Sequence, residues 1–274
     1  TISTGSIIAF AMDLYEQGII TDEDTGGLKL TWGNGQAMET LMHQIALRKG
    51  FGKILSLGVR GAAEVIGKGS DQYAYHTKGV EIYGGDPRGS QAIALAYTVS
   101  LRGGDFTSVY PIPAFRYTPE KAEKEFGTPA VVDPHVIEGK GILVRHCLFA
   151  SAIIDSLGLC KVPALSIIAD FTLENESLLV RALTGLALSA EALLYRGEQL
   201  VNMEKLFNLA HGASKESDNL PRVFQEQGLA HGPVKGLTVK DLSAMVQDFY
   251  RVMGWDEAGI PTEETLKRLK LEGN

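Results

Sequence analysis

The stretch Gly141-Ile-Leu-Val-Arg-His-Cys147-Leu-Phe-Ala-Ser-Ala-Ile-Ile-Asp155-Ser-Leu-Gly158-Leu159-Cys160 combines an apolar helical segment with both cysteines of the chain. Its residues up to Ser156 are apolar enough to form a buried helix, and Gly158 is a natural helix end because glycine adopts a left-handed backbone without steric cost. Asp155 would then lie in the last helical turn, where the partial negative charge of the helix end disfavours a carboxylate. This carboxylate needs hydrogen-bond donors from elsewhere. The segment therefore predicts a buried helix followed by an acceptor, a turn and Cys160, whose thiol is of the type that binds soft metals.

The two thiols of this stretch have different expected surroundings. Cys147 lies inside the predicted helix between apolar neighbours, so we expect a buried and inert thiol. Cys160 follows the helix-ending Gly158, where a side chain can point at a non-protein group. Two inert thiols are the simpler alternative, because cysteines near apolar residues usually only fill space. From these residues alone, both interpretations stay open for Cys160.

Helical periodicity, with apolar residues recurring at helical spacing, dominates the rest of the chain as well. Thr118 before Pro119 resembles a helix N-cap, and Thr238-x-x-Asp241 resembles a capping box. Weak strand candidates lie near 28–32 and 164–168. The predicted helices cover approximately residues 7–17, 36–48, 54–66, 91–101, 118–126, 138–157, 174–188, 189–210, 216–227, 238–253 and 262–271. This pattern predicts a mainly α fold with long ordered loops.

Composition and charge exclude several classes of protein. The 274 residues suffice for one large or two ordinary domains with a sizeable core. A net charge of −7 argues against a nucleic-acid partner, which would require clustered basic residues. No apolar run reaches the roughly 20 residues that span a bilayer, and the first apolar segment is short and followed by acids, unlike a secretory signal. The 2 cysteines make no disulfide framework, so we expect a reduced, cytoplasmic setting.

Two loops combine glycine with fixed charge, Asp86-Pro-Arg88-Gly89 and Arg102-Gly-Gly104-Asp105. They are either simple turns or places where the backbone approaches an anionic ligand. Their spacing matches neither a Walker A loop nor a dinucleotide-binding motif, and no hydrolase Gly-x-Ser-x-Gly is present. The histidines lack metal-ligand spacing, and we interpret each as structural or exposed. They are His43, His76, His135, His146, His211 and His231.

Several short motifs along the chain occur together in one known family. They are Thr1-Ile-Ser-Thr-Gly5, Ala11-Met-Asp-Leu-Tyr-Glu-Gln-Gly18, Arg48-Lys-Gly-Phe-Gly52, Asp86-Pro-Arg-Gly89, Arg102-Gly-Gly104, Asp155-Ser-Leu-Gly-Leu-Cys160, Leu206-Phe-Asn208, Asn219-Leu-Pro221, Gly232-Pro-x-Lys-Gly236 and Gly254-Trp255. In this order and spacing, they make nearly the whole chain resemble the tungsten-containing aldehyde:ferredoxin oxidoreductases.

The resemblance implies a domain arrangement. Members of this family have an N-terminal β-rich pterin-binding domain followed by two helical domains. Residues 1–75 would be the end of the second domain and residues 76–274 the third, while the β-rich domain is absent from this chain. Thr1 is not an initiator Met and runs straight into a helical pattern. We therefore expect a C-terminal piece of a longer polypeptide, inactive by itself.

The resemblance also implies cofactors. The family holds tungsten, or sometimes molybdenum, between two pterins, with a [4Fe–4S] cluster nearby and a Mg²⁺ ion expected to bridge the pterin phosphates. Three cluster cysteines come from an upstream Cys-x-x-Cys-x-x-x-Cys run, and the fourth corresponds to Cys160. Asp155, Gly158 and Leu159 correspond to the pterin-contacting motif. A companion motif would end just before Thr1, which places Thr1 beside the other pterin.

The chemistry of these residues agrees with the implied roles. A pterin presents a ring N–H and an exocyclic amine side by side, and an ionised Asp155 can accept both hydrogen bonds. Cys160 would be a thiolate whose charge is stabilised by iron. The protein would position and tune the cofactors, while the metal makes and breaks bonds.

The loop after the glycine pair departs from the family pattern. Aldehyde-oxidising members usually have a His where this chain has Phe106 and a pterin-binding Lys where it has Ser108, which we keep as a cofactor-binding candidate. An aromatic hydrocarbon cannot shuttle a proton, so the sequence identifies no catalytic residue. A divergent branch of the family forms the catalytic subunit of the ATP-independent class II benzoyl-CoA reductase. Phe106 would suit the dry, aromatic-lined pocket of such an enzyme.

Three hypotheses follow. The first is a segment of a tungsten–pterin enzyme that oxidises aldehydes to acids with ferredoxin as electron acceptor. The second is the aromatic-ring reductase of the same family, working with an electron-transfer subunit. The third is a non-catalytic helical interaction module that binds no metal. For the two enzymes we expect the remaining N-terminal part as a partner, a homo- or hetero-oligomer, and neither nucleic acid nor a membrane span.

Overall fold

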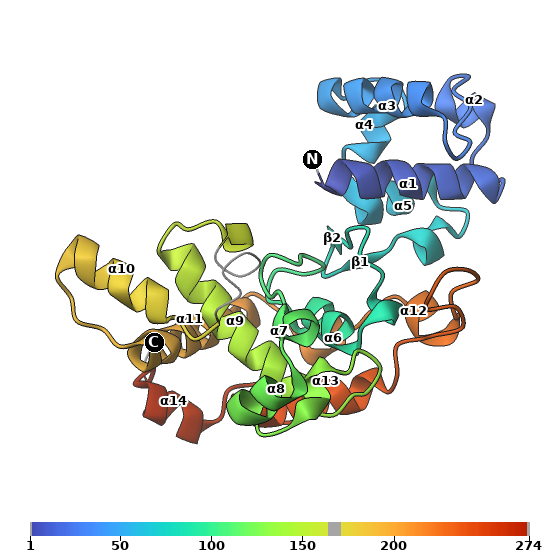
Figure 1. The fold of residues 1–274 in the computed structure, drawn as a ribbon. Coiled ribbons are helices and arrows are strands. Elements are labelled where there is room, and N and C mark those ends of the chain that lie inside the picture. The colour runs from blue at the N-terminus through green and yellow to red at the C-terminus, as the bar shows by residue number, and fades with distance from the viewer. Residues whose placement is uncertain (1, 164–170, 273–274) are drawn as a thin grey trace. The chain divides into compact units, whose positions relative to one another are not determined.

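The structure is a computed structural model and describes residues 2–163 and 171–272. These residues form fourteen α-helices, and the sheet within them is a single antiparallel pair of short strands (Figure 1). The predicted mainly α fold is confirmed. The chain divides into two compact units, Thr1–Asp86 with Arg102–Asp105, and Pro87–Leu101 with Phe106–Asn274. The predicted domain boundary between residues 75 and 76 stays a prediction.

The first unit is a set of helices around one apolar core. Its buried side chains include Phe10, Leu14, Leu41 and Leu55. The short hairpin belongs to this unit because Ser6 Oγ donates to the Ile82 carbonyl at 2.9 Å. The elements of this unit are α1 (Ile2–Glu16), α2 (Asp22–Thr25), α3 (Gly35–Leu47), α4 (Gly52–Leu55), α5 (Gly58–Ile66), the 3-10 helix η1 (Ser70–Tyr73), β1 (His76–Thr77) and β2 (Val80–Glu81).

The second unit is larger and contains the stretch with both cysteines. Its elements are the 3-10 helix η2 (Pro87–Gly89), α6 (Gln91–Val99), α7 (Pro113–Arg116), α8 (Pro119–Phe126), the 3-10 helix η3 (Pro129–Val132), α9 (Lys140–Ser156), α10 (Glu174–Thr184), α11 (Ala190–Ala210), the 3-10 helix η5 (Lys215–Ser217), α12 (Arg222–Glu226), α13 (Leu242–Met253) and α14 (Glu263–Leu269). The predicted Thr118 cap of α8 is confirmed, because its side chain accepts a hydrogen bond from Lys121 N.

Helix α9 is the central element of this unit and packs against α6, α11 and α13. Its residues 147–151 are all buried, as expected for a helix that is apolar on every side. Gly197 of α11 lies so close to α9 that a Cβ atom there would be 2.4 Å from the Phe149 carbonyl oxygen. A Cβ at Gly141 would be 2.4 Å from the Asp248 carboxylate of α13. These two glycines therefore let the neighbouring helices approach closely.

Several predicted helices have different bounds in the structure, and the one predicted at 174–188 ends at Thr184. The predicted helix 54–66 is interrupted at Gly58, whose φ of +79° is left-handed and therefore separates α4 from α5. The predicted helix 216–227 is wrong over most of its length, since Pro221 lacks an N–H and restricts the preceding residue. Helix α13 begins after Asp241, not at Thr238, because the Asp241 carboxylate accepts from Ala244 N at 3.1 Å.

The two strand candidates have different outcomes. Residues 28–32 form no strand, and the Leu30 side chain is buried in the first unit. The candidate at 164–168 lies outside the residues that the structure describes.

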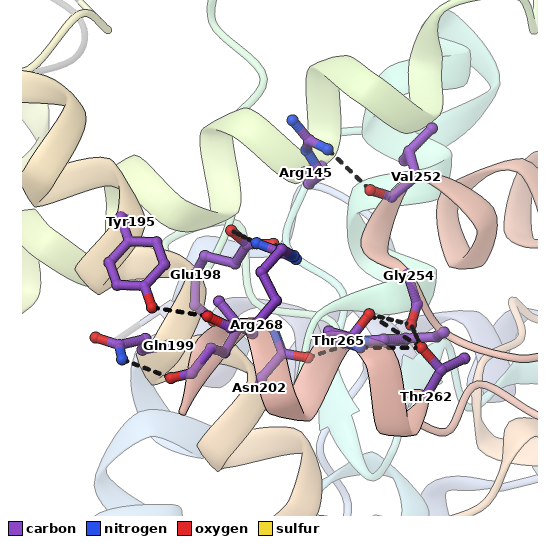
Figure 2. Close-up of polar contacts among 12 residues, drawn as sticks. Arg145, Tyr195, Glu198, Gln199, Asn202, Val252, Gly254, Thr262, Thr265 and Arg268 are labelled. Carbon is purple, nitrogen blue, oxygen red and sulfur yellow. Dashed lines mark hydrogen bonds and ion pairs between the residues drawn. The ribbon is translucent and has the colours of Figure 1, made fainter. Parts of the chain in front are cut away.

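Helix α14 is held by polar contacts to α11 and to the segment around Gly254 (Figure 2). Arg268 forms a two-pronged ion pair with Glu198 at 2.7 and 3.0 Å. Gln199 Nε2 donates to the Leu269 carbonyl at 2.7 Å, and Thr265 Oγ1 donates to the Gly254 carbonyl at 2.7 Å. The bond to the Leu269 carbonyl satisfies a main-chain acceptor at the C-terminal end of α14, and the ion pair with Glu198 fixes the helix on α11.

A buried polar cluster joins α11 to α13. The Asp218 carboxylate accepts a hydrogen bond from Tyr250 Oη at 2.5 Å and lies 3.5 Å from Lys205 Nζ. The Lys205 ammonium lies 4.8 Å from the centre of the Trp255 ring, and Trp255 Nε1 donates to Asn202 Oδ1 at 2.8 Å. Both charges are therefore partnered inside the unit, as buried charges must be.

The buried tyrosine predicts a dependence of stability on alkaline pH. Burial, and next the bond to Asp218, raise the pKa of Tyr250 above its ordinary value of 10.0. The folded chain keeps the phenol proton above about pH 10, where the unfolded chain loses it, so the free energy of unfolding falls as pH rises further. In Tyr250→Phe we expect a cost of about 2 kcal/mol at neutral pH and a shallower alkaline fall.

Urea unfolding of the two proteins between about pH 8 and pH 11 measures this difference. Comparison with the wild type cancels the titration of all other groups that the two proteins share. Parallel pH profiles for the two proteins would contradict the assignment of the alkaline effect to Tyr250.

Candidate cofactor site

The end of α9 forms the turn that the sequence predicts. Gly158 has a φ of +68°, and Leu159 N donates to the Ile154 carbonyl at 3.1 Å. This six-to-one hydrogen bond satisfies a carbonyl of the last helical turn. A Cβ atom at Gly158 would meet nothing within 4 Å, so glycine is required there for its backbone angle and not for space.

Asp155 has a donor that the sequence reasoning missed. Lys161 Nζ lies 2.6 Å from Asp155 Oδ2. The Lys161 side chain is only 8% exposed, whereas the Asp155 side chain is 57% exposed. The ion pair could have been predicted from the sequence, because Lys161 follows Asp155 by six positions and a cation near the C-terminal end of a helix also offsets the helix dipole. The carboxylate is thus held from the protein side and open to solvent on the other.

Lys161 also contacts the loop in which this chain has Phe106 and Ser108 instead of the His and Lys that aldehyde-oxidising members usually have. Its Nζ donates to the Thr107 carbonyl, 54 residues earlier in the chain. Phe106 and Ser108 flank Thr107, and both are half-buried. The Phe106 ring contacts the Tyr110 ring edge-on, with centroids 5.5 Å apart and planes at 74°. The structure therefore brings the neighbours of Ser108 to the end of α9 beside Asp155.

The two thiols differ as expected. Cys147 is fully buried, and burial raises the pKa of its thiol, so it is an inert core residue. Cys160 is exposed and unpaired in any disulfide. Within residues 2–163 and 171–272, no three His, Cys, Asp or Glu side chains gather as a metal site. Cys160 as the fourth ligand of a cluster therefore stays a prediction that needs ligands from outside this part.

An apolar cavity adjoins the same turn. It has a volume of about 690 Å³ and is lined mainly by leucines of α10, α11 and the end of α9, among them Leu157, Leu159, Leu183 and Leu193. Its size lies in the usual range of small-molecule sites. At this turn, Asp155 thus forms an ion pair with Lys161, and Leu159 lines the apolar cavity.

The two loops that combine glycine with charge, residues 86–89 and 102–105, make contacts with other residues of the protein. A Cβ atom at Gly103, whose φ is +120°, would lie 2.3 Å from the Thr77 carbonyl, so this glycine allows the loop to pack on the hairpin. Arg102 pairs with Asp105. Arg88 Nη1 donates to the Gln227 carbonyl at 2.9 Å, and its guanidinium lies over the Phe224 ring. These contacts account for the loops without an anionic ligand.

The remaining candidates are placed as follows. Thr1 lies outside the described residues, so its predicted pterin contact stays a prediction. His146 is half-buried, its removal from water lowers its pKa, and its ring hydrogen-bonds to the Phe171 carbonyl at 2.8 Å. This supports the structural interpretation of that histidine. Among the helices of residues 2–163 and 171–272, none is long and apolar enough to cross a bilayer.

The donor set at the helix end fits the two groups that the resemblance implies. An ionised carboxylate only accepts hydrogen bonds, and Asp155 presents one that is more than half exposed, as the paired N–H groups of a pterin require. Cys160 presents an exposed thiol, as an iron site requires, and Gly158 turns the chain between them. The acceptor and the thiol therefore lie five positions apart across one turn, where a pterin and a cluster could be held side by side.

The chain is similar to known proteins over nearly its whole length. The family described as "Aldehyde ferredoxin oxidoreductase, domains 2 & 3" matches residues 1–271. The tungsten-containing aldehyde ferredoxin oxidoreductase of Pyrococcus horikoshii is 35% identical over 99% of this chain. An aliphatic sulfonate oxidoreductase, WOR-like subunit, of Pyrococcus furiosus is 33% identical over 98% of it. The chain spans 43% and 40% of the lengths of these relatives.

A solved structure has the same fold. It is the active site complex BamBC of benzoyl coenzyme A reductase in complex with 1,5-dienoyl-CoA. The likeness has a TM-score of 0.74 at 21% identity and covers 98% of this chain and 44% of that chain. At this identity the likeness concerns the fold alone.

Proposed function

Because the chain belongs to the aldehyde ferredoxin oxidoreductase family, we propose that it forms the C-terminal helical part of an oxidoreductase with a tungsten, or molybdenum, bis-pterin and a [4Fe–4S] cluster. The enzyme oxidises aldehydes to carboxylic acids in the cytoplasm and passes the electrons to ferredoxin. The remaining N-terminal part of the enzyme supplies the β-rich domain, the other cluster cysteines and the second pterin motif. We also propose that this enzyme forms a homo- or hetero-oligomer.

The observation that supports this proposal is the paired exposure of Asp155 and Cys160 on either side of the Gly158 turn. The other cysteine and the partnered Asp218 are buried, as structural residues are. An exposed acceptor and an exposed thiol at one helix end leave room for non-protein partners. Both residues lie within residues 1–271, the range that the family matches, and this supports the proposal.

In the proposed mechanism, the residues of this chain bind and orient the cofactors. Asp155 would accept hydrogen bonds from the N–H groups of one pterin, while Lys161 holds its carboxylate from the protein side. Leu159 lines the apolar cavity beside the turn, and Cys160 would hold an iron of the cluster through its thiolate. When bound, the metal–pterin supplies the two-electron oxidation, in which aldehyde and water become carboxylic acid, two protons and two electrons. Because only four residues separate Asp155 from Cys160, this one turn would hold both a pterin and a cluster.

A second candidate is reduction of an aryl-CoA thioester by the same cofactors. The specific observation in its favour is the Phe106 ring, which contacts Tyr110 edge-on where aldehyde-oxidising members usually have a proton-carrying His. Two aromatic rings in this loop favour an aromatic substrate over a small polar aldehyde. Matched assays on the full-length enzyme separate the two functions, with an aldehyde and an oxidised dye in one arm and an aryl-CoA thioester and a reduced dye in the other.

Metal analysis tests both enzymatic proposals against a non-catalytic interaction module. We expect the full-length protein to contain tungsten or molybdenum together with iron and pterin. Absence of all four from protein produced with both metals supplied would leave the interaction module. The isolated 274-residue chain should bind no cluster and should not turn over either class of substrate, because it provides one cluster cysteine.

Replacement of the pterin acceptor gives a sharper prediction. In full-length Asp155→Asn, one charge-assisted acceptor becomes neutral, which costs about 2 kcal/mol in the bound state and so roughly thirtyfold in pterin retention. Pterin content after dialysis, measured by fluorescence of the oxidised pterin, reports this loss. Ser156→Ala is the matched control, since Ser156 Oγ only bonds back to the Ala152 carbonyl. Equal pterin content in Asp155→Asn and wild type would contradict the role of Asp155.

A further inference from the structure

Lys161 connects two distant segments of the second unit through one buried ammonium group. Its Nζ donates to Asp155 Oδ2 at 2.6 Å and to the Thr107 carbonyl. The side chain is 8% exposed, so the cation is largely removed from water. A buried ammonium is costly unless it is paired and hydrogen-bonded, and these contacts meet that requirement.

The Lys161 ammonium is buried more deeply than the Asp155 carboxylate, so the lysine determines the orientation of the carboxylate. Asp155 is 57% exposed and sits on the last turn of α9, so by itself its carboxylate could rotate among several positions. Lys161 is enclosed and cannot follow such rotation without losing the Thr107 bond. The ion pair therefore holds the carboxylate in one orientation, while its exposed side remains accessible.

The same ammonium restrains the loop that departs from the family pattern. Thr107 lies between Phe106 and Ser108, and its carbonyl is the acceptor. A main-chain bond at this point limits movement of both neighbours. The position of Phe106 is further limited by its ring contact with Tyr110. One cation thus couples the pterin-facing carboxylate to the loop of Phe106 and Ser108.

We propose that Lys161 is a positioning residue of the cofactor site, which orients the Asp155 carboxylate toward the pterin and ties it to the loop at 106–108. This rests on the proposed function, because it assigns Asp155 to a pterin. In this role Lys161 acts through Asp155 and Thr107. It is also the residue next to Cys160, so its charge favours the more negative, reduced form of a cluster at that thiolate.

The test uses the full-length holoenzyme with Lys161→Met, Lys161→Arg and, as a matched control, the exposed Lys124→Met. If Lys161→Met does not fold, Lys161→Gln takes its place. Three quantities are measured in each protein: pterin content after dialysis, the midpoint potential of the cluster by electron paramagnetic resonance, and amide hydrogen exchange of residues 106–110.

We expect Lys161→Met to lose pterin roughly tenfold faster, in line with the loss of one charge-assisted bond. Its cluster potential should become more negative, and amide exchange at 106–110 should rise. Lys161→Arg keeps the charge and should restore the potential and most of the pterin, whereas Lys124→Met should match the wild type in all three measurements.

Two results would overturn the proposal. The first is a Lys161→Met protein that exchanges faster at 106–110 but keeps its pterin and potential, since the lysine would then only support the loop. The second is a Lys161→Arg protein as impaired as Lys161→Met, because the charge would not matter. Wild-type protein without pterin and iron would instead refute the proposed function, while the exchange measurement would still test the Thr107 tie.

Discussion

Full-length Cys160→Ala is expected to lose its iron–sulfur cluster. If Cys160 is one of the four ligands, iron should fall from about four atoms per protein to below about one, because a [4Fe–4S] cluster with a missing thiolate is readily lost. The broad visible absorption of the cluster and its reduced-state paramagnetic signal should disappear with the iron. Iron analysis and spectroscopy on anaerobically purified protein measure this directly.

Cys147→Ala is the matched control, because it removes the other thiol of the chain. Cys147 is fully buried in α9, so its truncation should cost about 1 kcal/mol of stability and leave the iron content unchanged. Loss of the cluster from Cys147→Ala, with a normal cluster in Cys160→Ala, would reverse the assignment of the two thiols.

Gly197→Ala is expected to destabilise the second unit strongly. The added Cβ would lie 2.4 Å from the Phe149 carbonyl oxygen and 2.9 Å from its carbon, so α9 and α11 must move apart. Helix propensity alone would favour alanine by about 1 kcal/mol, but overpacking against main-chain atoms costs more. We expect a net loss of about 3 kcal/mol, or about 6 to 12 °C in the unfolding midpoint.

Gly5→Ala provides the control for helix propensity. Gly5 lies in α1, is exposed, and has nothing within 4 Å of the added Cβ. It should be neutral or stabilising by up to about 1 kcal/mol. Thermal unfolding of the two variants beside wild type measures both effects. An unchanged midpoint in Gly197→Ala would mean that α9 and α11 are less closely packed than the structure shows.

The sequence predicted the local features of α9 well. A run of apolar residues, a glycine that can adopt φ of +68°, and a cysteine in the middle of the run were enough to predict a buried helix, its end and the inert Cys147. Such features depend on neighbouring residues, and a single chain displays them directly. The resemblance to the oxidoreductase family, based on ordered short motifs, is confirmed by the match over residues 1–271.

Helix ends were predicted less well where a local preference competes with another. Thr238 resembled a cap, but the Asp241 side chain accepts the bond from Ala244 N. The helix expected at 54–66 is interrupted at Gly58, where a Cβ would lie 2.6 Å from Glu81 Oε1 of the hairpin. In both places the outcome depends on which of two acceptable local structures the neighbours favour.

By itself, the sequence determined the helical class, the α9 turn, the buried position of Cys147, and the family. Only the tertiary structure decided that Lys161 is the donor for Asp155 and that its ammonium also binds the Thr107 carbonyl, 54 residues away. The physical reason is that periodicity and backbone preference act over one or two turns, whereas the partner of a charge is set by which distant segments the folded core brings within about 3 Å of it.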